Sequence, residues 1–260
     1  MTANAIRPGT YLVLFFVAFC GIAAGQRPAY AIERNWVKCF ALPPGGSVSV
    51  ENVDGDIQVE GWDHAEVEAT VAMRSSSARD RLDDIRVAVE AKPGSLSFHT
   101  LYPGDLEKPV RVDYRLRVPR QVRLAELSTL QGAIVVREVE GSMKARSLHG
   151  DIKGLNVTGS VEARALTGNI LVALRSLPDP QAHVKLETIN GNLDLLVPAQ
   201  VNADLELTTV AGRILGNFPT QVSSVPGDST RHARLGEGGA HFELRTVRGN
   251  IVVGERDEEL

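Results

Sequence analysis

Apolar and polar residues alternate in a short unit that recurs seven times along the chain and is centred on a glycine. In its clearest copy, residues 184–195, the unit reads V-K-L-E-T-I-N-G-N-L-D-L. The glycines that align the copies are Gly55, Gly132, Gly150, Gly168, Gly191, Gly212 and Gly249. Because successive side chains of a strand point to opposite faces, this alternation predicts short β-strands with one buried face.

Each unit is predicted to contain two strands, one before the glycine and one after it. Apolar residues recur seven, five and two positions before the glycine, and two and four positions after it, and we expect these five positions to face the core. The alternation changes phase between the positions five and two residues before the glycine. A Thr, Ser or Asn usually lies between them, three residues before the glycine, and we predict a bend or bulge there. All seven residues two positions before the glycine are aliphatic, namely Val53, Leu130, Leu148, Leu166, Ile189, Val210 and Val247.

The glycine and the residue after it have the composition of a turn. Asp or Asn follows the glycine in five copies, and glycine suits a backbone with positive φ. We therefore interpret these polar residues as turn residues rather than ligands. They are Asp56, Asp151, Asn169, Asn192 and Asn250.

The repeat length points to a stack of coils. From Gly132 to Gly212 the glycines are 18, 18, 23 and 21 residues apart, which fits one coil of a β-solenoid or one blade-like hairpin. Six positions before the glycine the residues are Glu126, Lys144, Glu162, Lys185, Glu206 and Glu243, and the first five alternate in charge. Stacked coils would pair these charges on neighbouring strands. We therefore expect an all-β fold, a β-solenoid or right-handed β-helix-like stack with repeats of about 18–23 residues.

Segments outside the clearest repeats are assigned by the same patterns. Strands are expected at Glu66–Met73, Ile85–Val89, Ser95–His99 and Val110–Val118, with a helical turn at Asp80–Asp84. Residues 32–45 form a lead-in and cap, residues 46–254 the repeat domain, and residues 255–260 an acidic tail. Residues 218–239 form an inserted loop carrying Arg231, His232 and Arg234, which we interpret as a flexible excursion rather than a binding loop. Trp36 and Trp62 are assigned to capping, with carbohydrate stacking by Trp62 as the alternative.

The N-terminus indicates export. Arg7 precedes the apolar run Tyr11–Ala24, and Ala29-Tyr30-Ala31 supplies a small-x-small cleavage site, so residues 1–31 are predicted to be a secretory signal peptide. The alternative, an uncleaved anchor, is disfavoured because the apolar run is short for a bilayer. Cleavage removes Arg7 and Arg27, which leaves 26 basic and 32 acidic residues, a formal charge of −6. This charge disfavours nucleic acid as a partner. Cys39 alone remains, so we expect no intramolecular disulfide and a half-buried thiol.

Three segments resemble a known family. Residues 47–63 (S-V-S-V-E-N-V-D-G-D-I-Q-V-E-G-W-D), residues 116–119 (L-R-V-P) and residues 244–253 (L-R-T-V-R-G-N-I-V-V) resemble a bacterial family of domains of unknown function described as putative adhesins. That family is similar to the GIN-type head domains of putative autotransporter adhesins. The resemblance covers about residues 45–254. It implies a secreted or envelope-associated, β-helix-like protein, with no catalytic residues to carry over.

The residues themselves do not assemble a catalytic pattern. Polysaccharide lyases and hydrolases on β-helices need carboxylates clustered on adjacent coils, and the positions beside the repeat glycines place no two carboxylates on neighbouring coils. Asp54 with Asp56, and Asp151 beside His149, are alternative cation ligands, but structural turn roles are favoured. We therefore expect no enzyme activity and no catalytic, cofactor-binding or metal-binding residues.

The expected function is that of an exported, non-enzymatic cell-envelope protein with a binding or scaffolding role, similar to putative adhesins. Two alternatives remain open: a self-assembling β-helical structural element, and a polysaccharide-active lyase or hydrolase on a β-helix. The expected partners are an envelope polysaccharide, another envelope protein or further copies of the chain. No nucleic acid and no stable transmembrane segment after signal cleavage are expected. The expected location is the periplasm, the outer surface or the extracellular medium.

Overall fold

The computed structural model describes residues 32–75, 82, 85–102, 110–216 and 230–256 of the 260-residue chain. The predicted signal peptide, most of the predicted helical turn Asp80–Asp84, residues 218–229 of the predicted loop and residues 257–260 of the tail lie outside these ranges. Twenty strands, β1–β20, make up the described chain. The prediction of an all-β fold is confirmed. In the described parts, no helix has the length and apolar character needed to cross a membrane.

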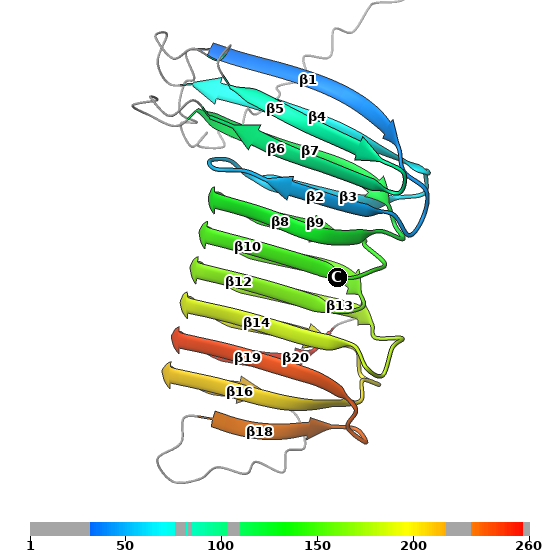
Figure 1. Ribbon diagram of the computed structural model, residues 1–260. Coiled ribbons are helices and arrows are strands. Elements are labelled where there is room, and N and C mark those ends of the chain that lie inside the picture. The colour runs from blue at the N-terminus through cyan, green and yellow to red at the C-terminus, as the bar shows by residue number, and fades with distance from the viewer. Residues whose placement is uncertain (1–31, 76–81, 83–84, 103–109, 217–229, 257–260) are drawn as a thin grey trace, which may run out of the picture.

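The strands form two ten-stranded sheets, called sheet A and sheet B. Sheet A has the order β1 (Ile32–Ala41), β4 (Glu66–Ser75), β7 (Arg111–Pro119), β3 (Ile57–Trp62), β9 (Ile134–Arg137), β11 (Ile152–Thr158), β13 (Ile170–Ser176), β15 (Leu193–Val197), β20 (Ile251–Glu255) and β17 (Ile214–Gly216). Sheet B has the order β18 (Thr230–Leu235), β16 (Ala203–Ala211), β19 (Ala240–Arg248), β14 (His183–Asn190), β12 (Val161–Thr167), β10 (Met143–His149), β8 (Arg123–Gln131), β2 (Ser47–Glu51), β6 (Ser95–Leu101) and β5 (Arg86–Lys92). Figure 1 shows the strands stacked from β1 at one end to β18 at the other.

Each repeat contributes one strand to each sheet, and successive strands pair in parallel. Met143 on β10 lies opposite Val161 on β12, and Val161 lies opposite Val184 on β14. Equivalent repeat positions therefore meet across the ladders. The two ends differ from this pattern, since β1, β4 and β7 pair antiparallel at one end of sheet A, and β5 and β18 pair antiparallel at the two ends of sheet B.

The last repeat does not follow the chain order. Strand β19 lies between β14 and β16, and β20 lies between β15 and β17. The repeat around Gly249 is thus inserted between the repeats around Gly191 and Gly212. Our assumption that coils stack in chain order was wrong at this point, so Lys185 is paired with Glu243, and Glu206 lies one strand further away.

The core lies between the two sheets and comprises four of the five predicted apolar positions. Val184, Leu186, Leu193 and Leu195 of the clearest repeat each have an exposed fraction of 0%. The fifth position, two residues before the glycine, is exposed in six of the seven repeats, so its predicted burial was wrong.

The repeat glycines stack on one another, and this close approach is what requires glycine. A Cβ atom on Gly150 would overlap the carbonyl oxygen of Gly132, and one on Gly168 would overlap that of Gly150. Gly212 does not have a positive φ, yet a Cβ there would still overlap the carbonyl oxygen of Gly249. The predicted positive φ is confirmed at six of the seven repeat glycines, and backbone proximity is a second reason that applies to all seven.

Two further expectations are corrected. Residues 230–235 of the predicted loop form the edge strand β18, which pairs antiparallel with β16 and carries Arg231, His232 and Arg234. Cys39 is exposed on the edge strand β1 rather than half-buried. The four strands expected between residues 66 and 118 are present as β4, β5, β6 and β7.

Candidate binding surface

Exposed aliphatic side chains form a continuous row across sheet B, beside the glycine turns. They occupy the position two residues before six of the seven repeat glycines, and their exposed fractions range from 37% to 70%. Neighbouring strands are about 4.8 Å apart, so six of these residues extend over about 24 Å. In the order of their strands, this aliphatic row is Leu130, Leu148, Leu166, Ile189, Val247 and Val210.

A buried hydroxyl directs the aliphatic row outward. Ser147 and Thr188, each three residues before its glycine, are 5% exposed, and both donate a hydrogen bond to the carbonyl oxygen of a glycine in the neighbouring repeat. Ser147 Oγ lies 3.1 Å from Gly132 O, and Thr188 Oγ1 lies 3.1 Å from Gly168 O. The alternation of β10 therefore continues without a bend through Ser147, and the next residue faces solvent. The predicted change of phase at Ser147 was wrong, and the ladders instead lack a pair one residue later, at Leu148.

Asp and Asn side chains fix the spacing of the turns beside the aliphatic row. Asn250 donates its backbone N–H to Oδ1 of Asn192 at 2.8 Å, and Asn192 donates in turn to Oδ1 of Asn169 at 2.9 Å. Asp151 Oδ1 accepts from the backbone N–H of Asn169 at 2.8 Å. These side chains link one repeat to the next, which is a structural role. The Asp151 carboxylate is used in this link, which disfavours it as a cation ligand beside His149.

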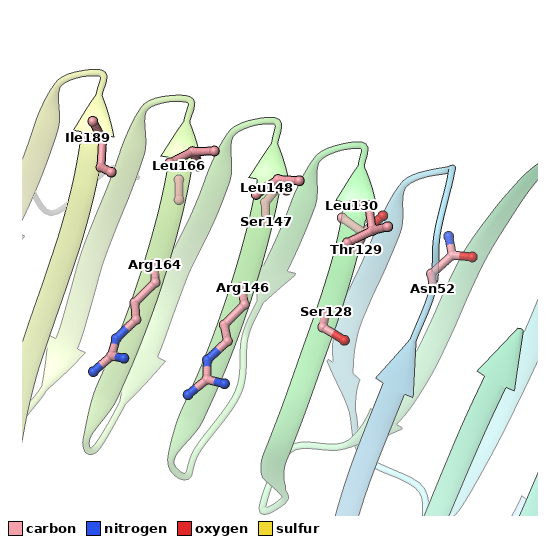
Figure 2. A pocket seen from close by; sticks show the side chains of 11 residues that line it. Asn52, Ser128, Thr129, Leu130, Arg146, Ser147, Leu148, Arg164, Leu166 and Ile189 are labelled. Carbon is pink, nitrogen blue, oxygen red and sulfur yellow. The ribbon is translucent and has the colours of Figure 1, made fainter.

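A shallow groove of about 410 Å³ follows the aliphatic row from Leu130 to Ile189. Figure 2 shows Leu130, Leu148, Leu166 and Ile189 side by side near the turns, and the side chains of Arg146 and Arg164 directed along their strands away from them. The groove wall thus combines aliphatic side chains with the stems of two arginines, which themselves cover apolar surface.

Ion pairs neutralise the polar surface next to the groove. Arg146 lies 3.7 Å from Glu126 and 3.6 Å from Glu162. Arg164 lies 3.2 Å from Glu162 and 2.9 Å from Glu187. Because each arginine lies between two carboxylates, the described part of this face offers no concentrated positive charge to an anionic ligand.

Asp54 and Asp56, the alternative cation ligands from the sequence, form ion pairs with an arginine instead. Arg111 lies 2.7 Å from Asp56, 3.7 Å from Asp54 and 3.0 Å from Asp113. Burial raises the pKa of Asp54, and the Arg111 charge opposes that rise. Among the residues that the structure describes, no group of three or more His, Cys, Asp or Glu side chains is arranged to hold a metal ion.

The two tryptophans lie near the β1 end of the stack. Trp36 is partly buried on β1 and packs against the core, as a cap would. The Trp62 Nε1–H donates to the carbonyl oxygen of Glu66 at 2.8 Å, and its ring lies 4.6 Å from the His64 ring and 5.9 Å from the Arg117 guanidinium. These neighbours give the Trp62 ring intramolecular contacts, and they favour capping over carbohydrate stacking.

The aliphatic row was the main feature that sequence reasoning misplaced, although the signal was present. Counting strictly by twos from the buried position five residues before the glycine places Ser or Thr inside and the aliphatic residue outside. The aliphatic character of that residue, considered alone, predicts burial instead. Six exposed aliphatic residues at one repeat position are more informative than the same residues in a core, since nothing in folding alone requires them there.

Among the comparisons with known proteins, the one with solved structures finds matches to this chain. No family model and no curated protein matches it. It is similar to a putative cell adhesion protein from Clostridium sporogenes (12% identity, 86% of this chain and 100% of that chain covered, TM-score 0.43). It is also similar to a putative adhesin from Bacteroides fragilis (10% identity, 89% and 100% covered, TM-score 0.30) and a putative lipid binding protein from Parabacteroides distasonis (11% identity, 86% and 97% covered, TM-score 0.27). Two of these names agree with the family that the sequence resembles.

Proposed function

We propose that this chain is an exported, non-enzymatic protein of the cell envelope that binds another envelope protein through the aliphatic row. The single observation that carries the binding role is the row itself, six exposed aliphatic side chains in register along about 24 Å of one sheet. Contiguous apolar surface on this scale is uncommon on a soluble monomer and marks interaction sites.

The scaffold suits such a role. We propose that the repeats form a two-sheet β-solenoid, supported by the parallel, in-register pairing of equivalent positions from β8 to β14 and from β9 to β15. A stack of this kind holds its surface side chains at fixed spacing, so little conformational entropy is lost when a partner binds.

A protein partner fits the row better than a polysaccharide. Sugar recognition commonly uses aromatic faces, and the row contains none. Neutralised arginines beside it do not favour a strongly anionic polymer. An extended apolar segment of a protein, bordered by uncharged polar residues, would bury the row and leave the neighbouring ion pairs at its rim.

The binding proposal is tested by site-specific photo-crosslinking in cells that produce the protein. A photoreactive residue is placed at Leu148, and a matched control is placed at Arg123, which is exposed at the start of the neighbouring strand β8. We expect a discrete protein adduct from position 148 and none from position 123. Equal labelling at both positions, or adducts that resist protease digestion and contain glycan, would contradict a protein partner at the row.

The location and the absence of activity are tested separately. Intact cells are treated with an impermeant protease, and the mature chain is followed beside a known periplasmic protein. Selective cleavage places the row on the outer surface, and protection equal to the control places it in the periplasm. Both outcomes support export, whereas retention in the cytoplasmic fraction contradicts it. Release of reducing ends or unsaturated products from an envelope polysaccharide would contradict the non-enzymatic proposal.

A further inference from the structure

The outer face of sheet A is apolar at its centre, whereas ion pairs cover the outer face of sheet B beside the aliphatic row. Strand β13 begins Ile-Leu-Val-Ala-Leu, and an unbroken apolar run of this kind is typical of a strand that is covered on both faces. Ala173 lies on the outward side of β13 and is only 2% exposed, because the leucines on both neighbouring strands flank it. The outward positions form two rows, one of Val135, Lys153, Leu171, Asp194, Val252 and Leu215, and one of Arg137, Leu155, Ala173, Leu196 and Gly254, with the exposed Arg137 at its margin.

Two opposite charges stand unpaired in this apolar face. Asp194 is half-buried between Leu171 and Val252 on the adjacent strands, and burial raises the pKa of its carboxyl. Lys153 is exposed on β11, between Val135 and Leu171. Neither side chain forms an ion pair or a hydrogen bond with any residue that the structure describes. A half-buried carboxylate without a counter-charge is unfavourable, so a cover that supplies a cation would stabilise it.

The face is complementary to itself about β13. Lys153 lies one strand to one side of Leu171, and Asp194 lies one strand to the other side. In the second row, Leu155 and Leu196 flank Ala173 in the same way. If a second copy is rotated by half a turn about an axis along β13, its aspartate lies opposite the lysine of the first copy. Each leucine then lies opposite a leucine of the other copy.

We propose that two copies of this chain pack face to face through sheet A about a two-fold axis along β13, so that Lys153 of each copy pairs with Asp194 of the other. Leu171 and Ala173 lie on the axis, and Leu155 meets Leu196 of the second copy. Sheets that pack in this way are about 10 Å apart with strands within about 30° of each other, a distance that lysine and aspartate side chains span together. The contact is isologous and closes at two copies.

The end strands favour this closed dimer over an end-to-end filament. Three of the four edge strands carry basic residues: β1 has Arg34 and Lys38, β18 has Arg231 and Arg234, and β5 has Arg86 and Lys92. Charged residues on an edge strand oppose its pairing with the edge of another sheet. The dimer leaves these charged edges and the aliphatic row free, and the small size of the apolar centre makes it a weak, concentration-dependent contact.

Sedimentation velocity of the exported chain, from Ile32 onward, tests for the dimer at protein concentrations up to about 1 mM, where even weak association is detected. We expect a reversible dimer that Lys153→Asp or Asp194→Lys alone weakens by about tenfold or more, because like charges then face each other. The double variant K153D/D194K restores it. An equimolar mixture of the two single variants also restores it, as a heterodimer.

The charge exchange separates pairing from folding. Circular dichroism and urea unfolding at low concentration check that each single variant folds, and rescue by the double variant cannot arise from a folding defect. Leu148→Ser with Leu166→Ser is the matched control, since it alters the aliphatic row and leaves the dimer unchanged. A wild-type monomer at every concentration, filaments, unweakened single variants, or a dimer lost with the row variant would each overturn the proposal.

Discussion

Lys185 on β14 donates a hydrogen bond from Nζ to Oε2 of Glu243 on β19 at 2.8 Å, although 58 residues separate them in the chain. This contact exists because the last repeat is inserted between two earlier ones. Glu206 then lies beside Glu243, and Arg245 pairs with both carboxylates, at 2.6 Å and 2.8 Å. Glu243 interrupts the predicted alternation of charge, and Arg245, two residues further along β19, neutralises it.

Replacing Lys185 with Gln should lower the free energy of unfolding by roughly 0.2–1 kcal/mol, the range for partly exposed pairs. Burial alone would raise the pKa of Glu243, but the hydrogen bond and charge of Lys185 hold that pKa below its ordinary value of 4.5. A lowered folded pKa gives stability that is present above pH 4.5 and is lost as pH falls through the folded pKa.

Urea unfolding at several pH values measures this effect. The K185Q variant should lose less stability than the wild type between neutral pH and acid, and the difference should shrink in about 1 M salt. The variant K144Q is a control of the same kind, because Lys144 lies at 3.6 Å and 3.9 Å from its carboxylates and makes weaker contacts. A larger effect from K144Q than from K185Q contradicts the assignment.

Replacing Gly150 with Ala should be strongly destabilising. The new Cβ would overlap the carbonyl oxygen of Gly132, which is backbone and cannot move without separating the stacked turns. We expect a loss of about 2–4 kcal/mol in the free energy of unfolding. Gly254→Ala is the control, because its Cβ would lie 3.6 Å from Leu196 Cδ2, an ordinary contact, and should change stability by less than about 0.5 kcal/mol. Similar urea midpoints for the two variants would disprove the steric role of the stacked glycines.

Tyr114 is 1% exposed, and its hydroxyl lies 2.6 Å from Thr100 Oγ1. Burial raises the pKa of Tyr114 to about 12, and the Thr100 hydrogen bond opposes that rise. A raised folded pKa gives stability that is present below pH 10.0 and is lost as pH rises toward the folded pKa. Tyr114→Phe should therefore reduce the alkaline loss of stability, with the remainder arising from Tyr102, whose pKa burial also raises.

At neutral pH the same Y114F variant should cost about 1–2 kcal/mol, because it leaves the buried Thr100 hydroxyl without its bond. Adding Thr100→Val removes that hydroxyl as well, and the double variant should recover part of the loss. Calorimetry at neutral pH and a phenolate absorbance titration measure the two effects. Additive losses in the double variant would show that the two hydroxyls act independently.

Local sequence patterns predict the strands of this fold, but they do not predict the order in which the strands lie in the sheets. The alternation around Gly191 predicts β14 and β15 because the period of two is a property of the extended backbone itself. The insertion of β19 beside β14 depends on how the chain returns after residue 216, and a strand pattern carries no information on the order of neighbours. Leu148 illustrates a different failure, since its side chain type suggested burial while its position in the alternation required exposure.

Substitutions at Leu148 and Leu166 measure whether side-chain type or position in the alternation decides the burial of these residues. Leu166 is 37% exposed, and Leu186 on the next strand is 0% exposed. Leu166→Ser should change the free energy of unfolding by less than about 1 kcal/mol, whereas Leu186→Ser should cost about 4 kcal/mol by leaving a cavity and a buried hydroxyl.

Combining Leu148→Ser with Leu166→Ser should keep the urea midpoint near that of the wild type and reduce the binding of a hydrophobic fluorescent dye. The dye reports exposed apolar surface, so its loss in a folded variant locates that surface at the aliphatic row. A large drop in the urea midpoint would mean that the row stabilises the fold, and its exposed leucines would then need no partner to account for them.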